Sequence, residues 1–376
     1  MASGESCVTE REAWLRINAA ELRPRAVINL LDRYGSPQDI LDADPRVLSE
    51  EVGLTPKELE RLAAAAARDY TEQLRTLDRL EAQLVSVRDA GYPANLRQIH
   101  DPPPVLFVRG AFQARDERCV AIVGTRRVTP YGRLVSETLA RDLAARGVTV
   151  ASGLAVGADA AAHRGALSAG GRTIGVLACG LDVLYPRETL ELREQASKQG
   201  AVISEVPLGT PAKPARFAAR NRIVSGLSLG VVVTEAPERS GALITAEIAA
   251  EQGREVFAVP GSVKSEFSLG THALLRDGAH LAAAVEDILE VLGLVDFAPV
   301  EGAREENAGA TESRLPTGLS ADEGNILATL SLQQRHVDEI IQESDIPASR
   351  TNAGLLTLEL KGLVRRLPGN MFMRVK

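Results

Sequence analysis

Short apolar runs and longer helical stretches alternate along the chain from residue 119 to about residue 292. The apolar runs have the length and β-branched content of buried strands, and they are CVAIVG, VTVASG, TIGVLACG, AVISEV, LGVVVTEA and EVFAVPG. Between most of them lie stretches with apolar residues at helical spacing, such as RLVSETLARDLAARG and ALITAEIAAEQG. The alternation predicts an α/β fold, an extended Rossmann-like parallel sheet with helices on both faces, in a domain at residues 91–295.

Residues 1–90 have a different pattern, in which short helical segments are separated by tight turns. The segments stop at YGSP (34–37) and at VGLTP (52–56), where Thr55 is placed to cap a helix that begins with Pro56. This pattern predicts a helical domain resembling SAM and helix-hairpin-helix modules. A small bundle used for packing or protein contacts is the alternative, because the turns carry few cations.

Residues 296–317 are polar, rich in Gly, Pro and Glu, and aperiodic, so they are predicted to be a flexible linker. Beyond them, residues 318–376 contain three helical patterns and then RRLPGNMFMRV, which reads as two short strands around a turn. Three helices followed by a hairpin is the order of a winged-helix domain. Its expected recognition helix carries only Arg350 and Lys361, so a protein-contact role and an auxiliary role on duplex DNA both stay open.

The composition is that of a globular protein, and the charge is unevenly distributed. The 376 residues carry a net charge of −7, but residues 91–295 contain 22 basic and 21 acidic residues, whereas residues 1–90 contain 12 and 17. The central domain can therefore hold a local basic groove within an acidic chain. No apolar run approaches the ~20 residues of a membrane span, and the N-terminus lacks a signal-peptide pattern. We expect a cytoplasmic protein that does not contact the membrane.

Three cysteines and five scattered histidines leave little basis for metal chemistry. The cysteine number is odd and no C-x-x-C pair is present, so a reducing compartment is expected, without a disulfide framework or a zinc site. We expect neither a metal nor a cofactor. The sequence also contains no G-x-S-x-G, H-E-x-x-H or Walker A motif. SGALITAE loosely resembles the PGGxGTxxE loop of nucleotide phosphoribohydrolases, but the double glycine is missing.

The candidate chemistry lies where predicted strands give way to helices. In a parallel sheet these strand ends share one edge, and helix starts there offer N–H groups to anions. Several of these places add a guanidinium, and one adds an aromatic ring. The candidate ligand-binding residues at this edge are Gly124, Thr125, Arg126, Arg127, Ser152, Gly153, Lys213, Arg216, Phe217, Arg220, Asn221, Arg222, Ser240 and Gly241.

Each of these residues also has a structural interpretation. The glycines can serve tight turns alone, and Phe217 can be a core residue instead of a base-stacking one. Arg220 and Arg222 can be ion-paired with Glu205 or Glu235. We expect Asp159 to be an N-cap rather than a catalytic acid, with His163, one turn later, as its structural partner.

Taken together, these segments resemble one known family. GTRRVTPYG, SGLAVGADAAAH, VLACGLDVLYP, ISEVPLG, FAARNRIVSGLS, SGALITAEIAAEQGREVFAVPG and GTHALLRDGA are similar, in order and spacing, to the DNA-processing protein A (DprA or Smf) family. Ala158 stands where that family usually carries isoleucine, with little expected effect because Asp159 is kept. The resemblance implies the three-part architecture predicted above.

The resemblance also implies a function, that of a non-enzymatic recombination mediator. Similar proteins bind single-stranded DNA, form homodimers through the Rossmann domain, and load RecA recombinase on incoming strands, including strands covered by single-strand binding protein, during natural transformation. The alternatives are a nucleotide-processing enzyme that uses the same phosphate sites, with Asp159 or Glu235 as acid or base, and a scaffold that binds only proteins. For about four phosphate contacts, log affinity is expected to fall with log salt at a slope near −3.

Overall fold

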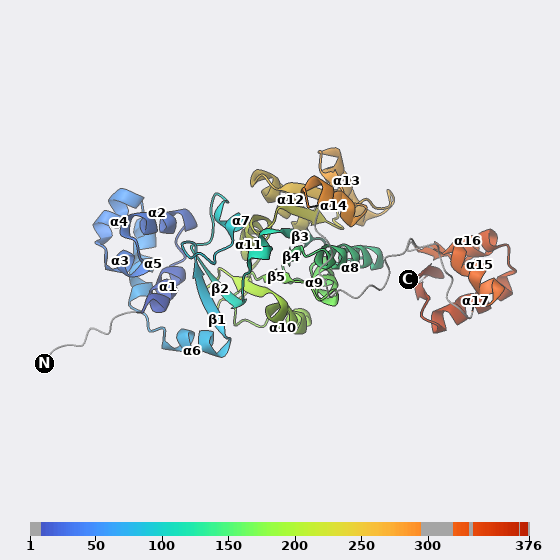
Figure 1. The fold of residues 1–376 in the computed structure, drawn as a ribbon, viewed down its shortest axis with the longest axis horizontal. Coiled ribbons are helices and arrows are strands. Elements are labelled where there is room, and N and C mark those ends of the chain that lie inside the picture. Colours follow the sequence, from blue (N-terminus) through green and yellow to red (C-terminus); the bar gives the residue numbers. More distant parts are fainter. Residues whose placement is uncertain (1–8, 295–318, 331–333, 368, 375–376) are drawn as a thin grey trace. The chain divides into compact units, whose positions relative to one another are not determined.

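The computed structural model describes residues 9–294, 319–330, 334–367 and 369–374 (Figure 1). The chain divides into two compact units, Met1–Ala303 and Arg304–Lys376. The predicted linker at 296–317 lies outside the described residues. Within those residues no helix is both long enough and apolar enough to cross a membrane.

The first unit begins with a helical module. Its helices are α1 (Glu10–Ala19), α2 (Pro24–Tyr34), α3 (Pro37–Asp42), α4 (Pro45–Val52), α5 (Pro56–Ala66) and α6 (Thr71–Arg79). Helices α2 to α5 each start with proline, whose missing N–H is not needed there. Thr55 caps α5 as predicted, in a reciprocal capping box with Glu58.

A nine-stranded sheet forms the centre of the same unit. The strands are β1 (Ala82–Ser86), β2 (Val105–Gly110), β3 (Cys119–Val123), β4 (Thr149–Ser152), β5 (Thr173–Val176), β6 (Ala201–Ser204), β7 (Gly230–Val233), β8 (Glu255–Ala258) and β9 (His280–Leu281). Their order is β1-β2-β6-β5-β4-β3-β7-β8-β9. Strands β3 to β8 are the six predicted runs and are parallel; β1 and β2 add an antiparallel edge and β9 a short parallel one, none of which the sequence analysis predicted.

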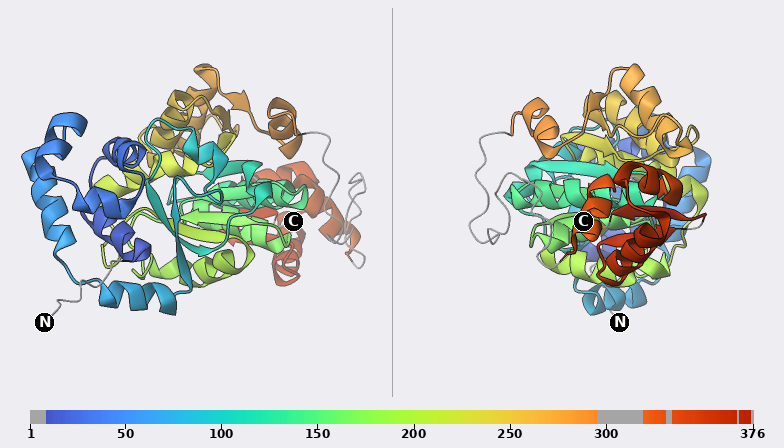
Figure 2. Two further views of the ribbon diagram at one scale, coloured as in Figure 1. Left: turned by 60° about the vertical axis from the view of Figure 1, so that its left-hand side comes forward. Right: turned by 90° about the vertical axis from the view of Figure 1, so that its right-hand side faces the viewer.

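Helices cover both faces of the sheet, as predicted (Figure 2). One face carries α8 (Pro130–Ala145), α9 (Ala158–Ser168), α10 (Leu190–Gln199) and α14 (Val285–Val291); the other carries α11 (Pro214–Gly226) and α12 (Gly241–Glu251). The alternation of side chains along β3 explains this, since Ile122 packs with Leu143 of α8 whereas Ala121 packs with Ile223 of α11. The shorter elements are α7 (Ala94–Arg97), η1 (Ala114–Glu117), η2 (Arg187–Thr189), η3 (Glu266–Ser268) and α13 (Leu269–Arg276).

The sheet reverses its winding direction at β3. The chain runs from β3 outward through β4, β5 and β6, and then returns to place β7 on the other side of β3. In open α/β sheets the crevice outside the carboxyl ends of the strands at such a switch point is the usual ligand site. Here the loops after β3 and β7 form its two walls.

The second unit has the predicted winged-helix order. It contains α15 (Ala321–Thr329), β10 (Arg335–His336), α16 (Val337–Ser344), α17 (Ala348–Leu360), β11 (Val364–Leu367) and β12 (Met371–Arg374), with strand order β10-β12-β11. Its core includes Ile326, Ile340, Leu355, Leu358 and Phe372.

Candidate nucleic-acid interface

The loop after β3 turns sharply because Gly124 lets it pass between two neighbours. A Cβ at Gly124 would lie 2.6 Å from the Cβ of Ala158 and 2.9 Å from the Oγ1 of Thr234. Thr125 is buried, and its N–H donates to the carbonyl of Glu235 (2.8 Å). The turn directs Arg126 and Arg127 to the surface, and neither forms an ion pair with any described residue.

Arg126 lies against an aromatic pair that we name the ring cluster: Arg126, Phe217 and Tyr185. The guanidinium carbon is 4.4 Å from the centre of the Phe217 ring, a cation–π distance. Tyr185 meets Phe217 edge-to-face, with ring centres 6.2 Å apart and planes at 61°. The three residues help to line a pocket of about 40 Å³ above the ends of β4 and β5. Sequence reasoning missed Tyr185, although an aromatic residue in a loop after a predicted strand was a usable signal.

The loop after β4 is held from below by Asp159. Its carboxylate accepts hydrogen bonds from the N–H groups of Gly153 (3.1 Å) and Ala155 (3.4 Å). Gly157, at φ +91°, occupies the N-cap of α9, so the predicted N-cap role of Asp159 is corrected to that of a loop brace. Burial raises the pKa of Asp159, and the nearby positive charge of Arg220 opposes that shift.

Besides Thr125, two further predicted DNA-binding residues lie inside the protein. Ser152 is fully buried and donates to the carbonyl of Ile122 (2.6 Å), joining β4 to β3. Arg220 is 6% exposed and donates to the carbonyl of Val176 (2.5 Å) beneath the loop at Gly153, where a Cβ would meet its guanidinium at 2.0 Å. Burial lowers the pKa of Arg220. Thr125, Ser152 and Arg220 therefore have internal roles, and we leave all three out of the proposed surface.

His163 is fully buried as well, but its partner is not Asp159. Its Nδ1 lies 2.7 Å from the Oγ1 of Thr173 on β5. Burial, together with the charges of Arg220 and Arg164, lowers the pKa of His163 to about 3. The ring is therefore neutral at physiological pH and packs α9 against the sheet.

Two predicted cations on α11 are engaged with acidic side chains. Arg222 pairs with Glu205 (2.6 Å) and with Asp101 (2.9 Å), which is the structural interpretation that the sequence left open, and its side chain is only 12% exposed. Arg216 pairs with Glu21 at the end of α1 (3.0 Å).

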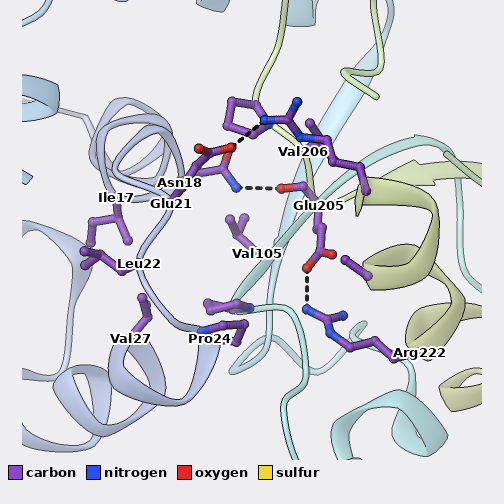
Figure 3. Close-up of a pocket in the computed structure, with 14 residues that line it drawn as sticks. Ile17, Asn18, Glu21, Leu22, Pro24, Val27, Val105, Glu205, Val206 and Arg222 are labelled. Atoms are coloured by element: carbon purple, nitrogen blue, oxygen red, sulfur yellow. Dashed lines mark hydrogen bonds and ion pairs between the residues drawn. The ribbon is translucent and has the colours of Figure 1, made fainter. Parts of the chain in front are cut away.

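These ion pairs border a pocket of about 260 Å³ between the helical module and the sheet (Figure 3). Asn18 adds a third tie across it, donating to the backbone carbonyl of Glu205 (2.8 Å). Burial raises the pKa of the Glu205 carboxyl, and Arg222 counteracts the rise. Arg216 fastens the module to α11, whereas Arg222 ties α11 to Asp101 and to Glu205, which Asn18 in turn holds to the module. Both arginines therefore belong to this junction.

The remaining predicted residues line the approach to α11 and α12. Lys213 precedes α11 and is exposed, with no ion pair to any residue in the described ranges. Asn221, one turn after Phe217, donates to the carbonyl of Gly241 (3.5 Å), and Ser240 caps α12. The structure brings Arg126, Gly153 and Phe217 together around one pocket and joins Asn221 to Gly241. The predicted residues that we keep for the proposed surface are Gly124, Arg126, Arg127, Gly153, Lys213, Phe217, Asn221, Ser240 and Gly241.

The two carboxylates that an enzyme could use are occupied. Glu235 is 3% exposed and accepts from both the N–H (2.9 Å) and the hydroxyl (2.6 Å) of Thr129 at the start of α8. Asp159 braces the β4 loop. The described residues contain no group of three or more His, Cys, Asp or Glu side chains that could hold a metal ion.

The cations of the winged-helix unit are mostly paired. Arg350 on α17 bonds Asp322 (2.7 Å from its Nε), and the Nζ of Lys361 lies 2.9 Å from Glu323. The described part of this unit holds six basic and seven acidic residues. It is therefore a poor match for the phosphates of a duplex.

Comparisons with known proteins agree with this architecture. A family model described as DNA recombination-mediator protein A matches residues 83–293, and one described as the DprA winged helix domain matches residues 310–370. Protein Smf of Escherichia coli (strain K12) is 35% identical over 367 residues, covering 96% of this chain and 95% of that protein. DNA processing protein DprA of Bacillus subtilis (strain 168) is 40% identical over 261 residues, covering 66% of this chain and 87% of that protein.

Solved structures give the same result. The X-ray structure of DNA processing protein A from Streptococcus pneumoniae superposes with a TM-score of 0.66 at 33% identity, covering 77% of this chain and 99% of that one. A Helicobacter pylori structure, whose description concerns the single-stranded DNA binding mode of DNA processing protein A, gives 0.51 at 30% identity and covers 58% and 98%. Because the family models together match residues 83–293 and 310–370, and a relative is 35% identical over 96% of the chain, the chain belongs to the DNA recombination-mediator protein A (DprA) family.

Proposed function

We propose that this chain binds single-stranded DNA along the carboxyl edge of its parallel sheet and acts as a recombination mediator rather than as an enzyme. The observation that carries the proposal is the ring cluster, in which the exposed guanidinium of Arg126 lies 4.4 Å from the Phe217 ring. Arg127 and Lys213 stand nearby in the chain, also exposed and without acidic partners among the described residues. The single-stranded DNA binding named for the Helicobacter pylori relative supports the proposal.

The ring cluster is suited to binding an unpaired strand without sequence preference. The cations bind phosphates, while a base stacks on the Phe217 ring or on the Arg126 guanidinium plane. The pocket beside the rings, at about 40 Å³, has room for little more than one water molecule, so a base lies over the cluster and not inside it. Affinity then comes from phosphate contacts, with stacking adding about 1–3 kcal/mol per base.

Membership of the family supports a wider role for this chain. In this proposal the protein works in the cytoplasm as a homodimer paired through the Rossmann domain, and loads a RecA recombinase onto incoming strands, including strands covered by single-strand binding protein, during natural transformation. Sedimentation tests the dimer. Recombinase filament growth on strands coated with single-strand binding protein tests the loading, and no acceleration by this protein would contradict it.

A titration of Arg126→Ala with fluorescent oligothymidylate tests the binding site. We expect at least tenfold weaker binding with an unchanged thermal transition, because the variant loses both a phosphate contact and the cation over the ring. Arg141→Ala, an exposed arginine on α8 paired with its neighbour Asp142, is the matched control and should bind like the wild type. Wild-type affinity in a folded Arg126→Ala protein would remove the assigned role.

The nucleotide-processing alternative predicts release of free base from a nucleoside monophosphate. We expect none, because Asp159 and Glu235 both accept hydrogen bonds from the loops that they support. Base release that is lost in Glu235→Gln would reinstate the enzyme.

A further inference from the structure

The strip of cations predicted from the sequence is incomplete in the structure. Arg216, Arg220 and Arg222 are engaged within the protein, which leaves three free cations, Arg126, Arg127 and Lys213. At about 0.7 per contact on a single strand, three contacts give a salt slope near −2. The salt slope near −3 that the sequence analysis predicts therefore needs further cations at the same edge.

The loop after β7, which forms the opposite wall of the switch-point crevice, supplies one further cation. Arg239 lies in the loop after β7, exposed and without an ion pair to any residue that the structure describes. Two hydrogen bonds hold this loop against its neighbours: Thr125 N–H donates to the Glu235 carbonyl (2.8 Å), and Ala236 N–H donates to the Phe267 carbonyl (2.9 Å). The second bond ties the β7 loop to the segment after β8, where Lys264 is likewise exposed and free of ion pairs within the described ranges.

The start of α12 provides an independent observation. Gly241 has no positive φ, and a Cβ built on it would meet nothing within 4 Å, so neither backbone strain nor packing with described residues accounts for a glycine there. A glycine is also used where a ligand approaches the backbone closely. Asn221 joins this turn to α11, one helical turn, about 5 Å, beyond Phe217.

We propose that the single strand continues from the ring cluster across the switch point, passing over Gly241, and that Arg239 and Lys264 bind its phosphates. From β3 to β8 is two strand spacings, about 10 Å, which extends the track by a few nucleotides. Glu238 and Glu266 stand exposed in the same loops, so each added contact is modest and the strip is not a general cationic patch. The inference rests on the proposed function and sets the course of the strand.

The test is the salt dependence of oligothymidylate binding by the full chain, for the wild type and for the double variant Arg239→Gln/Lys264→Gln. With five contacts the wild type should show a slope near −3.5, losing about 130-fold in affinity between 50 and 200 mM salt. The double variant, with three contacts, should show a slope near −2.1 and lose about 18-fold. Lys57→Gln/Arg141→Gln removes the same charge from α5 and α8 and should keep the wild-type slope.

The outcomes separate the two proposals. If the wild-type protein does not bind oligothymidylate, the proposed function itself is contradicted. Binding that depends on Arg126 but has the same slope in the wild type and in Arg239→Gln/Lys264→Gln overturns only the extended track. An equal loss in the Lys57→Gln/Arg141→Gln control would also overturn it, because the effect would then come from net charge.

Discussion

The cations at the sheet edge and the cations of the winged-helix unit are in opposite situations. Along the sheet edge, Arg126 and Arg127 project from a tight glycine turn with no acidic neighbour among the described residues, and one of them covers an aromatic ring. On the winged-helix unit, Arg350 lies on α17, the expected recognition helix, and Lys361 caps its C-terminal end, yet both bind acidic side chains of α15. A cation at the expected position is therefore not sufficient for polyanion binding; it must also lack an internal counter-charge.

The largest effect is expected at Arg222, a cation that is already ion-paired within the protein. Arg222→Gln leaves Glu205 and Asp101 without their partner in a half-buried junction, so we expect a loss of about 3 kcal/mol in the free energy of unfolding. Urea unfolding measures it. The double variant Arg222→Gln/Glu205→Gln should recover much of the loss, and a wild-type midpoint in the single variant would contradict a structural role.

Acidification should lower the unfolding temperature of the first unit more than that of the winged-helix unit. His163 has a pKa of about 3 in the folded state against about 6.5 when unfolded, so its contribution is fully present above pH 6.5 and is lost as the pH falls. Between pH 7.5 and pH 5.5 the first unit should lose about 1.4 kcal/mol, a fall of about 2–4 °C in its calorimetric transition.

The described residues of the winged-helix unit include no fully buried histidine, so the unfolding transition of that unit should move less. Equal shifts in both transitions would show that burial of His163 does not set the difference.

Loss of Tyr185 from the ring cluster should weaken single-strand binding less than loss of Arg126. Tyr185→Leu removes the edge-to-face partner of Phe217, and we expect single-strand affinity to fall about fivefold, or roughly 1 kcal/mol. Fluorescence anisotropy measures it. Tyr185→Phe keeps the ring and should bind like the wild type; an equal loss in both variants would assign the effect to the hydroxyl.

The smallest effect should be that of the paired winged-helix cation. Arg350→Gln breaks an exposed ion pair worth under about 0.5 kcal/mol and should leave both single-strand and duplex binding within twofold of the wild type. Deletion of 316–376 extends the test to the whole unit. A marked loss of duplex binding in either variant would restore an auxiliary DNA role for α17.

The sequence predicted the parallel sheet because its strands are continuous apolar runs separated by helical periods. It did not reveal β1 and β2, because Ala82–Ser86 and Val105–Gly110 pair antiparallel outside that alternation. The glycine turn at Gly124 was predictable from local chemistry. Whether each arginine is ion-paired within the protein was not predictable from local sequence. Arg216 pairs with Glu21, almost two hundred residues away, and Arg222 pairs with Asp101.

The Arg216–Glu21 ion pair couples two sites, because it occupies both a guanidinium beside the ring cluster and a carboxylate of the helical module. A phosphate that takes Arg216 must release Glu21, and a partner that occupies the turn at Glu21 must release Arg216, one residue from the Phe217 ring. By thermodynamic reciprocity each event then favours the other. A ligand that occupied the turn at Glu21 would therefore strengthen any contact that a phosphate makes with Arg216, through the helical module and without touching the sheet edge.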